Sequence, residues 1–431
     1  MSNKYSLRGL RDKYLSPSLS LSYNQPLHLV RGNGQYLYDE AGREYLDAVN
    51  NIQHIGHCHP KVIEAATSQL KKLNTNTRYL DETVLNYAQS LTEKLPEGLD
   101  VCFFTNSGSE SNDLALRIAR HYTESVETIV LGGAYHGHAI SLIEISPYKY
   151  NGTGGKGAPD HVYEVPMPDS FRGKYRGPKS GEKYVDEISK ILDQLRNDQK
   201  QVSLFISEAI MGCGGQLILP PPFLKDAYQL VRESGGLNIS DEVQIGFGRI
   251  GDHYWGFDSQ GVVPDIVTMG KSMGNGHPLS AVVTTREIAD RFNSGMEYFN
   301  SFGGNPVSSA IGHAVLNVIE EEKLQGNALK IGARLSSMLT KLKQKHSLIG
   351  DVRGKGLFLG IELIRDQLSL EPASIEAGEI VNKMKEKGIL MSTDGPDHNV
   401  IKIKPPMVFN EENAELLVNI FDEVLMKYEI K

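Results

Sequence analysis

Short apolar runs alternate with longer amphipathic segments between about residue 60 and residue 330. The runs that predict β-strands are 101–104, 128–131, 202–206, 237–240, 266–269 and 281–284. Runs this short, separated by helix-length stretches with one apolar face, are typical of a parallel sheet covered by helices. The pattern therefore predicts an α/β fold with a mostly parallel central sheet.

The pattern changes at both ends of the chain. Two short strands are expected at 35–38 and 44–49, and after residue 330 a helical stretch precedes the apolar segment 350–363. In the last segment, apolar residues recur at 417, 420, 421, 424, 425 and 428, which is helical spacing. We expect a smaller α+β domain built from residues 1–58 and 331–431, beside a large domain at 59–330. The long interruption at 147–183 is rich in Gly, Pro and Lys, and is either a functional loop or a surface excursion.

Composition narrows the function classes. The net charge of −8 and the pI near 5.9 argue against a nucleic-acid partner. No apolar run approaches the about 18 residues that a membrane span requires. Cys58, Cys102 and Cys213 are widely spaced and fit neither a disulfide framework nor a metal site, so no metal is expected. The first residues are charged and lack the apolar centre of a signal peptide, and we expect a cytoplasmic protein.

Two charged residues follow two of the expected strands. The run 237–240 ends on Asp241, and the run 266–269 is followed by Lys271 between glycines. An Asp can pair with the protonated pyridine nitrogen of pyridoxal phosphate (PLP), and a Lys can form a Schiff base with its aldehyde. A surface Lys and an ordinary strand-end Asp are the alternative. We predict Asp241 and Lys271 as catalytic residues of a PLP site.

Residues 101–122 combine a strand, a glycine-containing turn and a helix. Ser107 and Glu110 have the spacing of a capping box, and the helix carries one apolar face. The free N–H groups and positive dipole at a helix start favour a phosphate. Gly108 allows close approach and Ser109 adds a hydroxyl donor, so both are predicted to bind the cofactor phosphate. The unit by itself is common in α/β proteins.

Three further residues follow expected strand ends. Tyr135 and His136 could present an aromatic face to the pyridine ring, or could simply pack at the rim. Glu208 comes just after the run 202–206, before a glycine-rich loop. Its carboxylate is either structural or orients Asp241 or the substrate.

The motifs TNSGSESND, AYHG, SDEVQIGFGRIG, PDIVTMGKSMGNGHP and SFGGNP occur in this order across essentially the whole chain. In this respect the sequence resembles the class III aminotransferases of the fold-type I PLP enzymes. The resemblance implies a seven-stranded large-domain sheet and a homodimer with active sites at the interface. It implies Lys271 as the Schiff-base lysine and Asp241 as the partner of the pyridine nitrogen. The other residues that it places at the cofactor are Gly108, Ser109, Tyr135, Val243, Gln244 and, from the neighbouring subunit, Ser301.

Further motifs, including MPDSFRGKYR, GMEYFNSFGGNPVS and STDGPDHNVIKIKPPM, resemble the phospho-lyase branch of this family. The branch eliminates phosphate from a phospho-amine and releases aldehyde and ammonia. The expected substrate is O-phosphoethanolamine or a close phospho-amine. The alternative is an ω-aminotransferase that uses a keto acid acceptor.

The expected substrate contacts are basic. Most class III aminotransferases have an Arg in the strand before the PP pair, where it grips a carboxylate, whereas this chain has Lys402 there and Lys404 two residues later. In an extended strand both point to the same side, and a lysine pair suits a phosphate dianion. Solvated lysines at a sheet edge are the alternative. Arg78 is a further candidate, and Lys174 or Arg176 in the basic insert are weaker ones.

Overall fold

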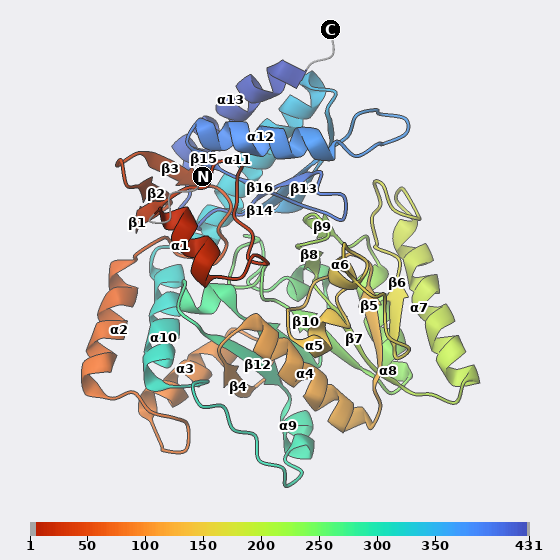
Figure 1. The fold of residues 1–431 in the computed structure, drawn as a ribbon. Helices are drawn as coiled ribbons and strands as arrows, with labels where there is room; N and C mark the ends of the chain where they lie inside the picture. The colour runs from red at the N-terminus through yellow and green to blue at the C-terminus, as the bar shows by residue number, and fades with distance from the viewer. Residues whose placement is uncertain (1–5, 429–431) are drawn as a thin grey trace.

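The structure, a computed structural model, describes residues 6–428, and a seven-stranded sheet forms its centre (Figure 1). All neighbouring strands are parallel except the second in the order, which is antiparallel to both of its neighbours. The prediction of a mostly parallel sheet is confirmed. In order across the sheet the strands are β4 (Val101–Thr105), β12 (Ser280–Thr284), β11 (Ile266–Met269), β10 (Leu237–Asp241), β7 (Val202–Ser207), β5 (Glu127–Leu131) and β6 (Val162–Val165).

The edge strand β6 was missed in the sequence because it lies inside the interruption at 147–183. Only Val162 and Val165 of its four residues are buried, so it has no continuous apolar run. The same interruption also contains the one-turn helix α6 (Pro147–Tyr150) and leads into α7 (Ser180–Asn197). Much of this segment is therefore sheet edge and connection.

Helices cover both faces of the sheet. The side chains of β7 alternate between the two faces and pack against helices on each. Alternate side chains of a strand point to opposite faces. Leu204 and Ile206 belong to a core with residues of α4 (Gly108–Thr123), while Phe205 packs on the other side with residues of α8 (Phe223–Glu233). The further covering elements are α5 (Ile140–Ile143) and α9 (Arg286–Phe292) on the α4 side, and α7 on the α8 side.

A second helical layer lies beside strands β4 and β12. The helix α10 (Pro306–Glu321) packs on α2 (Pro60–Lys72) and α3 (Glu82–Thr92). It also contacts the short helix η2 (Lys271–Gly274), which follows β11 directly. The packing of α10 therefore supports the segment that begins with Lys271.

Both chain ends contribute to one four-stranded sheet, in which Leu46 of β3 pairs with Ile389 of β15. A second four-stranded sheet lies beside it (Figure 1). We propose the boundary between the large and the small domain at residue 330. This position lies inside the long helix α11 (Leu324–Lys345), which runs from one part to the other. The strands are β1 (Leu29–Asn33), β2 (Tyr36–Asp39), β3 (Glu44–Asp47), β15 (Ile389–Leu390), β13 (Ile349–Lys355), β14 (Phe358–Leu363), β17 (Val400–Ile403) and β16 (Ser392–Asp394), and the helices are α11 (Leu324–Lys345), α12 (Ser374–Glu386) and α13 (Glu411–Leu425).

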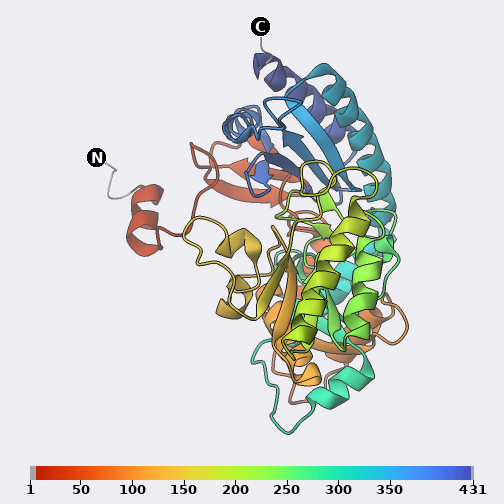
Figure 2. The ribbon, with the colours of Figure 1, turned by 90° about the vertical axis from the view of Figure 1, so that its right-hand side faces the viewer.

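The first helix, α1 (Leu7–Tyr14), has no buried residue and lies apart from the rest of the chain in Figure 2. The expected C-terminal helix is confirmed as α13, which ends in the 3₁₀ turn η3 (Met426–Tyr428). No helix within 6–428 combines the length and apolarity needed to cross a membrane.

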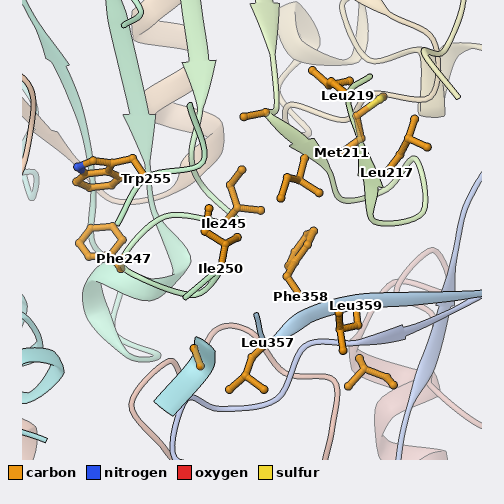
Figure 3. Packing of buried hydrophobic residues seen from close by; sticks show 14 of the residues in the cluster. Met211, Leu217, Leu219, Ile245, Phe247, Ile250, Trp255, Leu357, Phe358 and Leu359 are labelled. Carbon is orange, nitrogen blue, oxygen red and sulfur yellow. The ribbon is translucent and has the colours of Figure 1, made fainter. Parts of the chain in front are cut away.

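The loop after β10 is held between the central sheet and the C-terminal sheet (Figure 3). Its buried Ile245, Phe247 and Ile250 pack with Leu357 and Phe358 at the start of β14. The same cluster reaches the hairpin of β8 (Ile210–Met211) and β9 (Leu217–Ile218). This packing fixes the backbone of the loop that follows the polar end of β10.

A buried carboxylate, Glu242, anchors the same loop. It accepts hydrogen bonds from the backbone N–H groups of Gly256 (2.8 Å) and Phe257 (3.0 Å), and from the Ser240 hydroxyl (3.2 Å). Phe257 begins the short helix η1 (Phe257–Gln260), so the anion lies where helix N–H groups are free. Burial raises the pKa of Glu242 to about 7 in spite of these donors.

We expect Glu242→Gln to lower the free energy of unfolding by about 1–3 kcal/mol near pH 5, where the carboxyl is protonated, because the amide would turn an NH₂ group toward a backbone N–H donor that a carboxyl oxygen now faces. The raised pKa adds a pH dependence to the wild-type protein. The stabilisation that the raised pKa of Glu242 provides is complete below pH 4.5, the ordinary pKa of a Glu, and is lost as the pH rises through about 7. The gap between wild type and variant should thus narrow by up to roughly 3 kcal/mol by about pH 8.

Urea unfolding at fixed protein and PLP concentrations measures this gap. The exposed Glu233→Gln is the matched control and should stay within about 0.5 kcal/mol of wild type at each pH. A gap that is constant or widens with pH would contradict the role given to Glu242.

Candidate active site

Five strand ends converge on one cavity of about 330 Å³. Ligands of open α/β sheets bind at the carboxyl ends of the strands, and this cavity lies there. Its lining combines residues that follow β4, β5, β7, β10 and β11. Of the residues expected from the sequence, it brings together Gly108, Ser109, Tyr135, Glu208, Asp241, Val243, Gln244 and Lys271.

The Asp241 carboxylate is buried and held by three donors. Its Oδ2 accepts from Nδ2 of Asn112 and from Nδ1 of His136, both at 2.8 Å. Its Oδ1 accepts from the backbone N–H of Val243 at 3.1 Å. Three donors fix the plane of the carboxyl group and supply hydrogen bonds that its oxygens accept. An anion in this position can pair with a protonated ring nitrogen in the cavity.

The sequence does not predict the role of two of these donors. Asn112 is a polar residue one turn after Gly108 on the buried face of α4, and no local pattern distinguishes it. Its Nδ2 also donates to the carbonyl of His136 at 2.7 Å, so it joins α4 to the loop after β5. His136 was considered as an aromatic face, whereas here its ring is hydrogen-bonded edge-on to Asp241.

The start of α4 closes one side of the cavity. Ser107 caps the helix by accepting from the backbone N–H of Glu110 at 3.2 Å. The expected reciprocal capping box is absent here, because the Glu110 carboxylate accepts from Asn106 instead. A Cβ on Gly108 would lie 2.8 Å from Val243, so glycine permits the close approach of helix and loop. The free N–H groups and the Ser109 hydroxyl form a site suited to an anion.

Lys271 projects from the other side. Its backbone φ is +31°, in the left-handed region that costs a non-glycine residue on the order of 1–3 kcal/mol. No carboxylate within 6–428 forms an ion pair with its ammonium group. An amine without a counterion, held in a strained turn at the cavity wall, is suited to covalent and acid–base chemistry.

Several buried polar atoms around the cavity have no protein partner within the described part of the chain. They are Oδ1 of Asn112, Nε2 of His136 and Oε2 of Glu208. Burial, and next to it the charge of Asp241, raise the pKa of Glu208 to about 7. Its Oε1 accepts from the Gly212 N–H at 3.1 Å and from Gln244 Nε2 at 3.4 Å. Unsatisfied polar atoms at a cavity wall are expected where a polar group binds.

Lys402 and Lys404 do not line this cavity themselves, and they share one carboxylate. Lys402 Nζ donates to Oδ1 of Asp394 and Lys404 Nζ to Oδ2, each at 2.9 Å. The two lysines therefore extend to the same side of the chain, as alternate residues of an extended segment do. Lys404 also donates to Gln244 Oε1 at 3.2 Å, which connects it to the cavity wall. Burial raises the pKa of a carboxyl, but the two lysines lower that of Asp394 below its usual value.

The remaining expected residues do not line the cavity in a single chain. Arg78 is exposed, donates to the Glu297 carboxylate at 3.0 Å and lies over the Phe299 ring. Ser301 is exposed on the loop before α10. Lys174 of the basic insert is paired with Glu187. Among residues 6–428, no group of three or more His, Cys, Asp or Glu side chains could hold a metal ion.

Comparisons with known proteins agree with this site. Residues 20–425 match the family model described as aminotransferase class-III. A Drosophila melanogaster protein named alanine–glyoxylate aminotransferase 2-like is 49% identical over 96% of this chain and 86% of its own length. A Caenorhabditis elegans protein named ethanolamine-phosphate phospho-lyase homolog 1 is 44% identical over 93% of this chain and 89% of its own.

The solved structure of an Arthrobacter phospholyase in complex with phosphoethanolamine superposes with a TM-score of 0.93. It is 39% identical, and the superposition covers 99% of this chain and all of that one. The sequence expectation of the fold-type I architecture and of PLP as cofactor is confirmed.

The cavity fits this cofactor, because it offers an anion for the ring nitrogen, an amine for the aldehyde and helix N–H groups for the phosphate. The chain therefore belongs to the class III aminotransferase family, and it uses pyridoxal phosphate.

Proposed function

We propose that this protein is a PLP-dependent phospho-lyase that eliminates phosphate from O-phosphoethanolamine or a close phospho-amine, giving aldehyde, ammonia and phosphate. The names of the C. elegans relative and of the Arthrobacter structure support this reaction. The observation that carries the proposal is the lysine pair beside the cofactor cavity. Two ammonium groups face one carboxylate, Asp394, and this leaves an excess positive charge.

A lysine at position 402 favours a phosphate ligand over a carboxylate that needs a two-pronged grip. An Arg at this position would offer a planar fork to a carboxylate, whereas an ammonium is a point charge without that preference. The Lys402 side chain is 22% exposed, while that of Lys404 is 3% exposed. We therefore assign the direct contact with a substrate phosphate to Lys402, the more exposed member of the pair, and Lys404 adds its positive charge.

PLP, when bound, withdraws the electron pair that remains when a C–H bond next to the substrate nitrogen is broken. Asp241 maintains the positive charge on the ring nitrogen that this withdrawal requires. Lys271, once its amine is free, accepts the proton from the carbon that carries the substrate nitrogen. Lys271 is the amine that lines the cavity within the described residues, and this supports its role as the base.

The electron pair from the C–H bond then forms a C=C double bond to the neighbouring carbon, and the C–O bond on that carbon breaks. The phosphate departs with the C–O bonding pair, and Lys402 stabilises the charge of the leaving group. Loss of one proton and one phosphate leaves an enamine, which takes up water and gives the aldehyde and ammonia. Asp241 and Lys271 would act in the same way in amino transfer. The residues that bind the rest of the substrate therefore decide between elimination of phosphate and amino transfer.

An ω-aminotransferase that uses a keto acid acceptor is the second candidate. The name of the D. melanogaster relative favours it. It requires a group that grips the acceptor carboxylate, and the ammonium group of Lys402 lacks the planar fork that binds a carboxylate in two hydrogen bonds.

The first prediction is that PLP-loaded protein releases inorganic phosphate and acetaldehyde in equal amounts from O-phosphoethanolamine without any keto acid. Lys271→Ala should abolish both products, because it removes the base. The measurement follows phosphate and aldehyde in the same sample. Amino transfer to pyruvate or 2-oxoglutarate, with no phosphate released, would establish the aminotransferase instead.

The second prediction is that Lys402→Met raises KM for O-phosphoethanolamine by about tenfold to hundredfold, the value of a hydrogen bond between charged groups. Lys174→Met is the matched control, because Lys174 is exposed and paired with Glu187. Steady-state kinetics should give the control a KM within about twofold of the wild-type value, because substitutions of exposed side chains usually have small effects. Equal effects of both changes would argue against a phosphate contact at Lys402.

We also propose that the working unit is a homodimer with the active sites at the interface. Large apolar side chains are exposed near the loop of Ser301, namely Leu80 (98%), Met296 (72%) and Phe302 (71%). Of these three, Leu80 lines a second cavity of about 410 Å³ beside β4, whose lining also includes Asn300 and Gly303 of the Ser301 loop. Exposed apolar groups in such a cluster favour a protein partner. A second copy would cover them and bring the partner's Ser301 to the cofactor phosphate.

The third prediction concerns Ser301→Ala, which should weaken PLP binding about tenfold if the hydroxyl donates to the phosphate of the neighbouring site. Titration of cofactor-free protein with PLP, followed by fluorescence, gives the dissociation constant. Ser294→Ala, in the same exposed loop, is the control and should leave it unchanged. Sedimentation of both variants shows whether dimer formation is retained. A monomeric wild-type protein would contradict the arrangement.

We propose a cytoplasmic location as well. Cys58, Cys102 and Cys213 all carry free thiols. Free thiols are compatible with a reducing compartment, where they persist without forming disulfides.

A further inference from the structure

Lys404 is placed differently from Lys402, although both bond to Asp394. Its ammonium group is enclosed by the Asp394 carboxylate at 2.9 Å, Gln244 Oε1 at 3.2 Å and the Phe358 ring, whose centroid lies 4.6 Å away. Three neighbours saturate a group with three N–H donors. Lys404 therefore has no hydrogen bond left for a substrate, and its contact with the cavity runs through Gln244.

The Gln244 amide has only one orientation that satisfies these contacts. Its Oε1 accepts from Lys404 and, at 3.3 Å, from Asn51 Nδ2, so both lone pairs of the oxygen are used. Its Nε2 has one contact, with Glu208 Oε1 at 3.4 Å. A Cβ on Gly212 would lie 2.2 Å from Nε2, so the loop packs closely on the amide. The second N–H of Nε2 remains for the cavity that Gln244 lines.

The groups that PLP carries indicate what this N–H would meet. Asp241 would hold the ring nitrogen, Lys271 the aldehyde carbon, and the start of α4 the phosphate. The ring oxygen is the polar group that these residues leave without a partner, and Gln244 and Glu208 are further polar side chains that line the cavity.

We propose that Lys404 is a positioning residue that orients the Gln244 amide so that its N–H donates to the ring oxygen of PLP. Donation stabilises the ionised ring oxygen and so disfavours a proton on the nitrogen that joins Lys271 to the cofactor. Lys404 therefore connects the C-terminal sheet to the protonation state of the bound cofactor. The inference rests on PLP binding alone and is the same for a lyase and an aminotransferase.

The pH dependence has several possible contributors, and the test must separate them. The charged and titratable groups around Gln244 and the cavity are His136, Glu208, Cys213, Asp241, Lys271, Asp394, Lys402 and Lys404. Loss of any nearby positive charge also favours a proton on the cofactor nitrogen. A variant of Lys404 alone cannot distinguish the loss of its positive charge from a change in the orientation of the Gln244 amide. The shift of the titration midpoint must therefore be measured with and without Gln244.

The experiment is an absorbance titration of the lysine-bound cofactor in wild type, Lys404→Met, Gln244→Leu and the double variant. Lys404→Met and Gln244→Leu should each raise the midpoint by about one pH unit, the effect of losing one hydrogen bond to an anion. The double variant should be no higher than Gln244→Leu, because Lys404 acts through the amide. Lys402→Met removes the same charge from Asp394 without touching Gln244 and should give a clearly smaller shift.

Additive shifts in the double variant, or an equal shift in Lys402→Met, would overturn the proposal in favour of a simple charge effect. An unchanged midpoint in Gln244→Leu would overturn it as well, even if Lys404→Met did not fold. Because the readout is the colour of the bound cofactor, a failure here is distinct from a failure of the lyase assay.

Discussion

The buried carboxylate of Asp241 is the interaction on which the rest of this site depends. A buried anion is costly unless donors surround it, and Asp241 receives them from α4, from the loop after β5 and from its own loop. Each donor fixes one wall of the cavity relative to the others. The position of the charge and the shape of the cavity are therefore determined by the same contacts.

The loop after β10 transmits this arrangement to the C-terminal sheet. Glu242 anchors its start, and the apolar side chains that follow pack against β14. Arg249, fully buried in the same loop, donates to the carbonyls of Leu357 and Pro405 at 3.0 and 2.8 Å. Pro405 directly follows Lys404, so these hydrogen bonds join the segment of the lysine pair to the loop that follows Asp241. The same loop carries Gln244, which contacts Lys404 directly.

The cavity retains unfavourable features that folding alone does not explain. Lys271 has a left-handed backbone, and three buried polar atoms of Asn112, His136 and Glu208 have no partner among the residues described. Each reduces stability by on the order of 1–3 kcal/mol. Such costs concentrate where a bound group restores the missing contacts, and PLP carries a ring nitrogen, an oxygen, an aldehyde and a phosphate that can do so.

The sequence by itself determined the sheet, the covering helices and the chemistry at the strand ends, because these depend on local periodicity and on which residue follows each strand. Asp241 and Lys271 could be chosen for this reason. Tertiary structure alone decided that Asn112 and His136 hold Asp241, that β6 completes the sheet, and that Lys404 faces Gln244 while Lys402 remains partly exposed. It also placed Arg78 and Ser301 away from the cavity of their own chain. These contacts are made between residues far apart in the sequence. A local sequence pattern does not predict which distant residue a side chain will contact.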